Sequence, residues 1–541
     1  MSQETQDKPK TVPERLDGLF APWNRSDAPG LAVGVAKDGR VLYRRGFGMA
    51  SLESRTAMAP STRLRIGSTS KHFTALLALL LQEEGKFDLD APIRTYLPEL
   101  TGPGGEPSAR LLLQHRGGSR CYLDLGFLTR GMTSAPVGES LKAQARQGGR
   151  NFAAGESMIY NNGGYHLVSI AIERAGGVPF EDQLKTRLFE AVGMVDTISL
   201  PSDFIILPGM AAMHLPAPGG GWRRGLFPSE EVRGEGAIVS TIDDMLRWMA
   251  HLRRRDLFGQ ADSWRQLTER PAYADGRQGA YALGLMVDTY RGRPTLHHAG
   301  GVIGGTAQML TLPDDGLDVI ILVNGAPAAN AVRLAEQVAD IVLADRLEPE
   351  AGRPQSEAWP VLIGRWWSPD AGITYDFLDE KGELKSALNG APIGGNLTLR
   401  DGQLVTPPGG IGEIAIDPTH AKEGEITVSF GGRFFVCRKV VEAEKLDPAF
   451  VAAIEGGYSS ADADGTASIR LDGEKLIARF SDPFGCVDVT LRQLGVALAG
   501  TGLSAAGSPH FATLAFAMGD GIATGFTLNS ARTRNLVFER A

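Results

Sequence analysis

Apolar positions in the N-terminal part of the chain recur first with the period of strands and then with that of a helix. Residues 31–48 read as two strands joined at Asp38-Gly39, because Asp-Gly readily adopts the positive φ angles of a tight hairpin turn. Residues 68–85 place leucine and phenylalanine at helical spacing, and Gly85 stands where such a helix would stop. The pattern predicts a β-hairpin followed by an apolar helix.

A second group of elements is predicted further along the chain. Thr241 precedes two acidic residues, which is typical of a helix start. The apolar run 319–323 predicts a central strand, and a helix is expected at 331–344 with Asn330 as its N-cap. Because strands lie at both ends of this segment and helices between them, we predict an α+β domain over residues 1–345, with an antiparallel sheet flanked by helices.

The pattern changes beyond this domain. Residues 347–360 are rich in Pro and Glu and poor in periodic apolar positions, which indicates a linker. Short alternating segments with turn residues such as Gly431-Gly432 follow, and they favour antiparallel β structure. We predict two antiparallel β-barrel domains, residues 346–445 and 446–541, since a closed barrel leaves no strand edge exposed.

A weak internal repeat supports two β units. Ile363-Gly-Arg-Trp-Trp resembles Glu455-Gly-Gly-Tyr. Arg433-Phe-Phe-Val-Cys-Arg likewise resembles Asn535-Leu-Val-Phe-Glu-Arg. A similar segment therefore opens each unit, and another similar segment closes it.

Composition places this chain of 541 residues among globular proteins, with 43% hydrophobic and 22% charged residues. The net charge of -8 comes without a basic stripe, so we expect no nucleic-acid partner. The apolar runs are far shorter than the roughly 20 residues that span a bilayer, so we expect no membrane partner. The first fifteen residues are polar and lack the apolar stretch of a secretory signal.

Three cysteines, Cys121, Cys437 and Cys486, have no metal-ligand spacing. Their odd number suits free thiols in a reducing compartment, and we expect each to be buried as a small hydrophobe. With the polar N-terminus, this predicts a cytoplasmic protein.

Ser68-Thr69-Ser70-Lys71 sets a hydroxyl and an amine three residues apart, on one face of the first turn of the apolar helix. This arrangement suits a nucleophile and its base, provided that burial lowers the pKa of Lys71 enough for the amine to accept a proton. The spacing alone is weak evidence, because about one Ser-X-X-Lys is expected by chance in a chain of this length. A capping serine beside a solvated lysine is the plainer alternative.

Tyr160-Asn161-Asn162 supplies a second polar element, in a turn before a helix that starts near Gly164. The Tyr160 phenol could relay a proton from Ser68 to a leaving group, and Asn162 could contact the substrate carbonyl. A turn of this composition is equally typical of a packed ring beside two turn-forming residues.

His297-His298-Ala299-Gly300-Gly301 is the third element, after an expected strand. Glycines here would let the backbone approach a ligand, and the Gly301 N–H could join the Ser68 N–H in an oxyanion hole. One histidine would assist and the other would pack. No His-Glu-X-X-His motif or cysteine cluster accompanies the pair, so we expect no metal, and the glycines fail the dinucleotide pattern, so we expect no cofactor.

The order Ser-X-X-Lys, Tyr-X-Asn, His-X-Gly resembles the β-lactamase and penicillin-binding-protein superfamily, in the branch where His-X-Gly stands in place of Lys-Thr-Gly. Together with two β-barrels, the chain looks most like the bacterial D-aminopeptidase family. That resemblance implies a metal-independent serine hydrolase that releases N-terminal D-amino acids from small peptides or amides and pairs as a homodimer. It implies the following roles: nucleophile, Ser68; proton-transfer pair, Lys71 and Tyr160; substrate contacts, Asn162, Gly300 and Gly301; third-motif residue, His298. The chain departs from the resemblance at residues 115–118, His-Arg-Gly-Gly, where relatives often have His-Thr-Ser-Gly.

The resemblance also implies a loop of the last barrel that reaches the catalytic cleft and restricts it to substrates with a free amino end. We expect this loop at residues 480–486, with Asp482 pairing with the substrate ammonium and Phe484 blocking longer substrates. An ordinary hairpin turn is the alternative there, since Asp, Pro and Gly are usual turn formers.

Other functions remain open on the same residues. An esterase or another amidase would use the same motifs, because they fix acyl transfer but not the acyl group. A binding protein with a vestigial active site is an alternative of another class, although it would have no need of all four catalytic side chains. Penicillin hydrolysis is disfavoured, since no general base dedicated to deacylation is recognisable.

Overall fold

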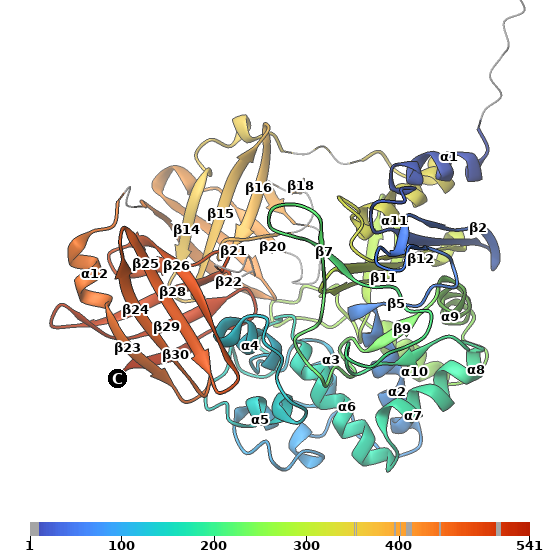
Figure 1. Ribbon diagram of the computed structural model, residues 1–541, viewed down its shortest axis with the longest axis horizontal. Coiled ribbons are helices and arrows are strands. Elements are labelled where there is room, and N and C mark those ends of the chain that lie inside the picture. The colour runs from blue at the N-terminus through green and yellow to red at the C-terminus, as the bar shows by residue number, and fades with distance from the viewer. Residues whose placement is uncertain are drawn as a thin grey trace, which may run out of the picture.

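The computed structural model describes residues 10–541 except 351, 353, 394–396, 401, 407–413, 443–444 and 505–509. The first nine residues of the polar N-terminal segment, and two positions of the predicted linker, lie outside the described residues. Figure 1 shows the α+β domain, called the first domain from here on, on one side and two β units on the other, with the C-terminus in the last unit.

A six-stranded antiparallel sheet forms the centre of the first domain. Its strands, in spatial order, are β10 (Met286–Tyr290), β11 (Arg293–Val302), β12 (Gly305–Leu312), β13 (Leu317–Val323), β1 (Leu31–Lys37) and β2 (Arg40–Phe47). The predicted hairpin is confirmed, with Lys37 paired to Arg40 across a turn in which Asp38 and Gly39 both have positive φ. The predicted central strand is β13, which pairs with β12 and β1.

Helices cover both faces of this sheet. Val33 and Val35 pack toward α1 (Val12–Phe20) and α11 (Ala331–Val342), whereas the alternate residue Ala32 belongs to the cluster on the other face. Because both faces are buried, β1 and β13 are apolar at nearly every position instead of alternating, with Lys37 and Asp318 as the exceptions. Thr241 and Asn330 cap α9 (Ile242–Arg254) and α11 as expected, each accepting a backbone N–H three residues on. The predicted α+β arrangement is confirmed.

The remaining elements of this domain are short or lie on the side of the sheet that carries α2. The helices are α2 (Lys71–Glu83), α3 (Ala109–Leu113), α4 (Tyr122–Arg130), α5 (Glu139–Ala145), α6 (Asn162–Gly176), α7 (Phe180–Leu184), α8 (Glu190–Val192) and α10 (Ala261–Thr268). The short strands are β3 (Met49–Ser51), β4 (Thr56–Ala57), β5 (Leu64–Arg65), β6 (Ile198–Ser199), β7 (His214–Pro216), β8 (Trp222–Arg224) and β9 (Ile238–Ser240).

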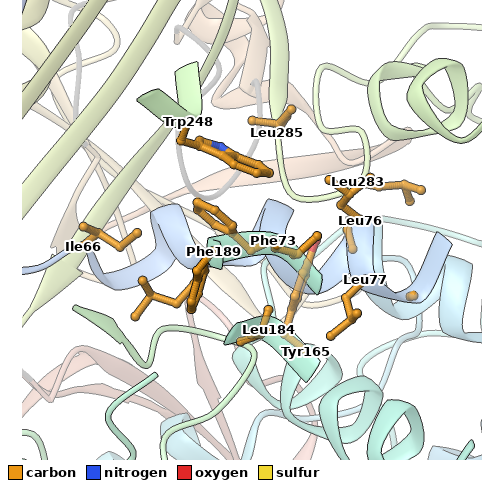
Figure 2. Packing of buried hydrophobic residues seen from close by; sticks show 14 of the residues in the cluster. Ile66, Phe73, Leu76, Leu77, Tyr165, Leu184, Phe189, Trp248, Leu283 and Leu285 are labelled. Atoms are coloured by element: carbon orange, nitrogen blue, oxygen red, sulfur yellow. The ribbon is translucent and has the colours of Figure 1, made fainter. Parts of the chain in front are cut away.

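Helix α2 runs through the main hydrophobic core (Figure 2). Its residues are buried without interruption from Lys71 to Leu81. Phe73 stacks on Trp248 with ring centroids 4.1 Å apart and meets Phe189 edge-on at 5.7 Å. Such packing stabilises the domain by the area it removes from water, at roughly 25 cal/mol per Å². The same packing buries the amine of Lys71 in the interior of the domain.

The second unit is a nine-stranded antiparallel sheet. In spatial order its strands are β17 (Ala391–Pro392), β16 (Glu383–Leu388), β15 (Ile373–Glu380), β14 (Gly364–Ser368), β22 (Arg433–Val440), β21 (Glu425–Phe430), β20 (Ile414–Asp417), β19 (Gln403–Val405) and β18 (Thr398–Arg400). Within the described residues the end strands β17 and β18 are not paired with each other, and the chain between them includes residues 394–396. The unit is therefore a curled sheet where we expected a closed barrel.

The third unit is a closed eight-stranded barrel preceded by α12 (Pro448–Ile454). Its strands are β23 (Gly456–Ser460), β24 (Gly465–Asp472), β25 (Lys475–Asp482), β26 (Gly485–Gly495), β27 (Leu498–Gly500), β28 (Ala512–Gly519), β29 (Ile522–Ser530) and β30 (Leu536–Arg540). The prediction of a barrel is confirmed here. Each larger sheet is built from strands of one predicted domain, while the exact boundaries at 345 and 445 stay a prediction.

Both β units pack on the first domain. Leu125 and Leu128 of α4 belong to the hydrophobic cluster of the barrel, where α4 contacts β25 and β26. Arg120 pairs with Asp462 of the barrel at 2.6 Å, and the arginine side chain is only 2% exposed. The turn between β21 and β22 of the curled sheet lies directly against Met158 of the first domain. A Cβ at Gly431 in this turn would be only 2.7 Å from the Met158 backbone, so there is no room for a side chain. Met158 is two residues from Tyr160, so each β unit contacts the wall around the candidate site.

Candidate active site

Ser68 and Lys71 lie where the sequence predicts them, at the start of the core helix. Ser68 belongs to a turn of 3-10 helix, η2 (Gly67–Ser70), and α2 begins at Lys71, so the regular helix starts three residues later than expected. The two side chains still meet, with Lys71 Nζ 3.0 Å from Ser68 Oγ. The i, i+3 relation survives because 3-10 geometry also sets such residues on one face.

Lys71 is fully buried and bonded to three oxygen atoms. Besides Ser68, its Nζ donates to Asn162 Oδ1 at 2.8 Å and to the Glu235 carbonyl at 2.7 Å. Burial lowers the pKa of Lys71 to about 7, although the charge of Glu235 opposes the shift. A neutral amine has two N–H groups. The Asn162 and Glu235 oxygens occupy both, which leaves the lone pair for the Ser68 hydroxyl.

Tyr160 lies against the same pair. Its ring centroid is 4.8 Å from Lys71 Nζ, and its side chain is buried. Burial raises the pKa of Tyr160 above its ordinary value, against the hydrogen bond with Ser68. The phenol therefore keeps its proton over the ordinary pH range and is placed to exchange it with the Ser68 oxygen.

Asn161 and Asn162 divide two tasks between them. Asn161 is the N-cap of α6, where its Oδ1 accepts the Gly164 N–H. Asn162, the first residue of that helix, turns its amide oxygen toward Lys71 instead. Asn162, the predicted substrate contact, therefore lies next to Ser68 because it is bonded to Lys71.

His298 lies in β11 with its ring buried beside Tyr160, at 6.3 Å between ring centroids. Its Nδ1 is 2.6 Å from the Ala299 carbonyl oxygen, which can only accept, so Nδ1 carries the ring proton. Nε2 then accepts from the Tyr281 hydroxyl at 2.9 Å. Burial lowers the pKa of His298 well below its ordinary value, and the ring is neutral. Tyr281, a polar neighbour that no motif marks, is thereby part of the site.

The glycine-rich end of β11 passes directly beside the nucleophile turn. A Cβ at Gly300 would lie 1.9 Å from the Ile66 carbonyl oxygen, and one at Gly67 would lie 2.9 Å from the Gly301 nitrogen. Neither approach is compatible with a side chain. At Gly301 a Cβ would meet no atom within 4 Å, so this residue borders open space next to Ser68.

Glu235, a buried carboxylate that sequence reasoning missed, lies next to Lys71 and bonds to its amine through the backbone carbonyl. Glu235 Oε1 accepts the Tyr122 hydroxyl at 2.6 Å and lies 3.1 Å from His166 Nδ1. Burial acts to raise the pKa of Glu235, but its interactions with His166 and Tyr122 hold that pKa below its ordinary value. No local pattern announces this cluster, because its members come from three separate segments.

The structure does not bring Asp482 to this group. Its carboxylate pairs with Arg130 at 2.6 Å and also accepts the Thr129 hydroxyl and the backbone N–H groups of Phe484 and Gly485. The Asp482 side chain is 4% exposed. The stretch is a tight hairpin between β25 and β26. This placement corrects the expectation that Asp482 faces a substrate ammonium, since its oxygens are already occupied.

We expect Asp482→Ala to lower the free energy of unfolding by about 3 to 5 kcal/mol, because Arg130 would keep a buried, unpaired charge. Denaturant titration measures the change. Asp488→Ala is the matched control, since its pair with Arg479 is largely exposed and worth at most about 1 kcal/mol. If stability is unchanged and the preference for free-amine substrates is altered, Asp482 binds the substrate ammonium and its structural role is wrong.

The cysteines and one surface cavity have no assigned part in this chemistry. Cys121 and Cys437 are buried as expected, whereas Cys486 is exposed, because it follows the hairpin turn on the barrel surface. A cavity of about 1320 Å³ opens at the far end of α2, around Lys86 and Arg265. None of the predicted site residues lines it, so chemistry and not cavity size places the candidate site at Ser68.

The described part of the chain holds neither a cluster of metal-ligating side chains nor a helix of membrane-spanning length. No three His, Cys, Asp or Glu side chains among those residues are grouped to hold a metal ion. No helix there is both long enough and apolar enough to cross a bilayer.

The rate of Ser68 acylation is expected to rise with pH through an apparent pKa of about 7, that of Lys71. Below this value the amine is protonated and cannot accept the serine proton, and above it the lone pair is free. The measurement uses 4-nitrophenyl acetate, which has no titrating group of its own. A rate that stays flat would exclude Lys71 as the base, and a rise only near the ordinary pKa of lysine would contradict the lowered pKa of its amine.

Comparisons with known proteins identify the family of the chain. Residues 14–343 match the family described as Beta-lactamase. A D-aminopeptidase from Brucella canis is 28% identical over 363 residues, which are 65% of this chain and 66% of that protein. The chain thus spans just under two thirds of the length of this curated relative.

Two solved structures share the fold. The octameric penicillin-binding protein homologue from Pyrococcus abyssi has a TM-score of 0.56 at 21% identity and covers 78% of this chain and 99% of its own. The D-amino acid amidase from Ochrobactrum anthropi SV3, complexed with D-phenylalanine, has a TM-score of 0.54 at 20% identity and covers 62% and 100%. The predicted superfamily resemblance is confirmed. Because the family match spans more than half of the residues, the chain belongs to the beta-lactamase family.

Proposed function

We propose that this protein is a metal-independent serine hydrolase that works through an acyl-enzyme and releases N-terminal D-amino acids from small peptides or amides. The observation that carries the proposal is the buried Lys71 amine, with a pKa lowered to about 7 and its lone pair directed at Ser68 Oγ 3.0 Å away. A structural lysine would have no reason to be desolvated beside a serine hydroxyl.

In the proposed reaction Ser68 Oγ attacks the substrate carbonyl carbon and its proton passes to Lys71 Nζ. The carbonyl oxygen gains charge and is met by the backbone N–H groups of Ser68 and Gly301. Tyr160 donates its proton to the leaving amine and recovers one through the Ser68 and Lys71 pair, and the amide bond breaks. Water then attacks the ester by the same route in reverse, releasing the amino acid and restoring Ser68.

The remaining predicted residues hold this group in place. Asn162 fixes the Lys71 amine and presents its amide toward the substrate side. His298, neutral and bonded to Tyr281, lies beside Tyr160 as a polar group without charge. The choice of an aminopeptidase over other acyl transfers rests on the Brucella canis relative, which is named a D-aminopeptidase.

Assembly and location also remain proposals. We retain a homodimer from the family resemblance, and the octameric penicillin-binding protein homologue marks a larger assembly as the alternative that sizing would reveal. The cytoplasmic location stays a prediction from the cysteines and the polar N-terminal residues.

A substrate panel tests the proposal. It combines p-nitroanilides of D- and L-amino acids with p-nitrophenyl esters and a chromogenic cephalosporin, each assayed with the wild type and with Ser68→Ala. Ser68-dependent release from D-aminoacyl p-nitroanilides is the expected result. Turnover of esters alone would identify an esterase, and no Ser68-dependent turnover at all would favour the non-catalytic binding protein.

A further inference from the structure

A loop of the barrel does reach the candidate site, but it is the connection between β29 and β30, residues 531–535. Asn151 holds it from both sides, donating to the Arg532 carbonyl at 2.9 Å and accepting the Arg534 N–H at 2.7 Å. Arg120 donates to the Arg534 carbonyl at 2.9 Å. Ser530 bonds the Asp124 carboxylate at 2.7 Å. These bonds fix the loop on the first domain without any substrate.

The loop carries a guanidinium to the catalytic tyrosine. The Arg532 guanidinium carbon is 4.8 Å from the ring centroid of Tyr160, the same separation as that of Lys71 Nζ. Arg532 is half-buried. No carboxylate pairs with its side chain among the residues that the structure describes, whereas Arg120, which holds the same loop, pairs with Asp462.

The charge of Arg532 acts on the pKa values of both Lys71 and Tyr160. It contributes to the lowered pKa of Lys71 after burial, and it opposes the raised pKa of Tyr160. Glu235, the buried acid of the group, already contacts Tyr122 and His166 through Oε1 and accepts the Arg233 N–H at Oε2. A fixed cation beside Tyr160, with no carboxylate of the described residues paired to it, attracts an anionic group of the ligand.

We propose that Arg532 binds a carboxylate of the substrate, so that the barrel selects anionic substrates for the Ser68 site. This inference rests on the proposed function. Tyr160 is the proposed donor to the leaving amine, and Arg532 lies over its ring. The carboxylate is therefore that of the leaving amino acid, as in a dipeptide. An acidic side chain on the D-amino acid is the second source of the same chemistry.

The test compares matched substrates in the wild type and in Arg532→Gln. For D-Ala-Gly against its C-terminal amide, wild-type kcat/KM should favour the free carboxylate by about tenfold or more, the worth of one charge-assisted hydrogen bond. Arg532→Gln should abolish that ratio by slowing the dipeptide alone, and Arg532→Lys should keep part of it. D-Asp and D-Asn p-nitroanilides form the second arm. A ratio lost only in that arm would assign the carboxylate to the side chain.

The control is Arg479→Gln, the same change on the outer surface of the same barrel, which should leave both ratios unchanged. Thermal unfolding of each variant shows that the loop is still folded. If Arg532→Gln slows acid and amide equally, or changes neither ratio, the inference is wrong and Arg532 acts only on Tyr160 and Lys71.

Failure of the proposed function gives a different result. If the wild type hydrolyses neither dipeptide nor amide, the aminopeptidase assignment is wrong and the carboxylate site is tested by protection. Glycylglycine should slow Ser68 acylation by 4-nitrophenyl acetate in the wild type more than glycylglycine amide does, and it should lose this advantage in Arg532→Gln. Equal protection by both compounds in the wild type would overturn the inference.

Discussion

Ser68→Ala is expected to lower turnover by at least about 10³-fold while the protein stays folded. The substitution removes the oxygen that both Lys71 and Tyr160 contact, and with it the atom that attacks the substrate. The fold loses one hydrogen bond, worth about 1 kcal/mol. The measurements are kcat on a D-aminoacyl p-nitroanilide and the midpoint of thermal unfolding.

Ser70→Ala is the matched control for this prediction. Ser70 is buried in the same turn, but its hydroxyl accepts the Ile238 N–H at 3.2 Å and serves the fold. We expect Ser70→Ala to lose stability and keep most of its activity. A folded Ser68→Ala protein with near-normal turnover would contradict the nucleophile assignment. A slow acylating ester followed by mass spectrometry should place the adduct on the peptide that contains Ser68.

Local patterns were sufficient where the chemistry is local. The spacing of Ser68 and Lys71 brings their side chains together in any helical turn, and the apolar helix that follows buries the amine. Tyr160 and His298 stand far from them in sequence. Only the order of the three motifs predicted that they would meet, because no local rule links a turn at 160 to a strand at 298.

Contacts that depend on tertiary structure were beyond such patterns. Glu235 reaches the Lys71 group through its backbone carbonyl, and a carbonyl carries no sequence signal. In the barrel, the hairpins at 480–486 and 531–535 both contain turn formers. Both hairpins contact the first domain, but Asp482 is held by Thr129 and Arg130 of α4, whereas Arg532 lies over the Tyr160 ring. Which of the two meets the site depends on how the barrel packs on that domain, and the turn residues carry no signal of this packing.

The internal repeat predicted more of the fold than its weak similarity suggests. Its two opening segments are β14 and β23, and its two closing segments are β22 and β30. In each unit the first strand pairs with the last, β14 with β22 and β23 with β30. The repeat therefore marks the seam where each sheet returns on itself. It could not show that the first sheet stays open between β17 and β18 in the described residues, because those short strands have no counterpart in the repeat.

Lys71→Ala and Tyr160→Phe are each expected to lower kcat by about 10²- to 10⁴-fold, and the double variant should lose far less than the product of the two. Both side chains move the same proton at Ser68 Oγ, so removing the second costs little once the first is gone. Tyr165→Phe is the matched control. Its ring also lies against Lys71 Nζ, at 5.3 Å, but its hydroxyl donates to the Leu113 carbonyl at 2.6 Å. We expect it to retain near-normal kcat and to combine additively with Lys71→Ala. Full additivity between Lys71→Ala and Tyr160→Phe would instead mean that the two groups act in separate steps.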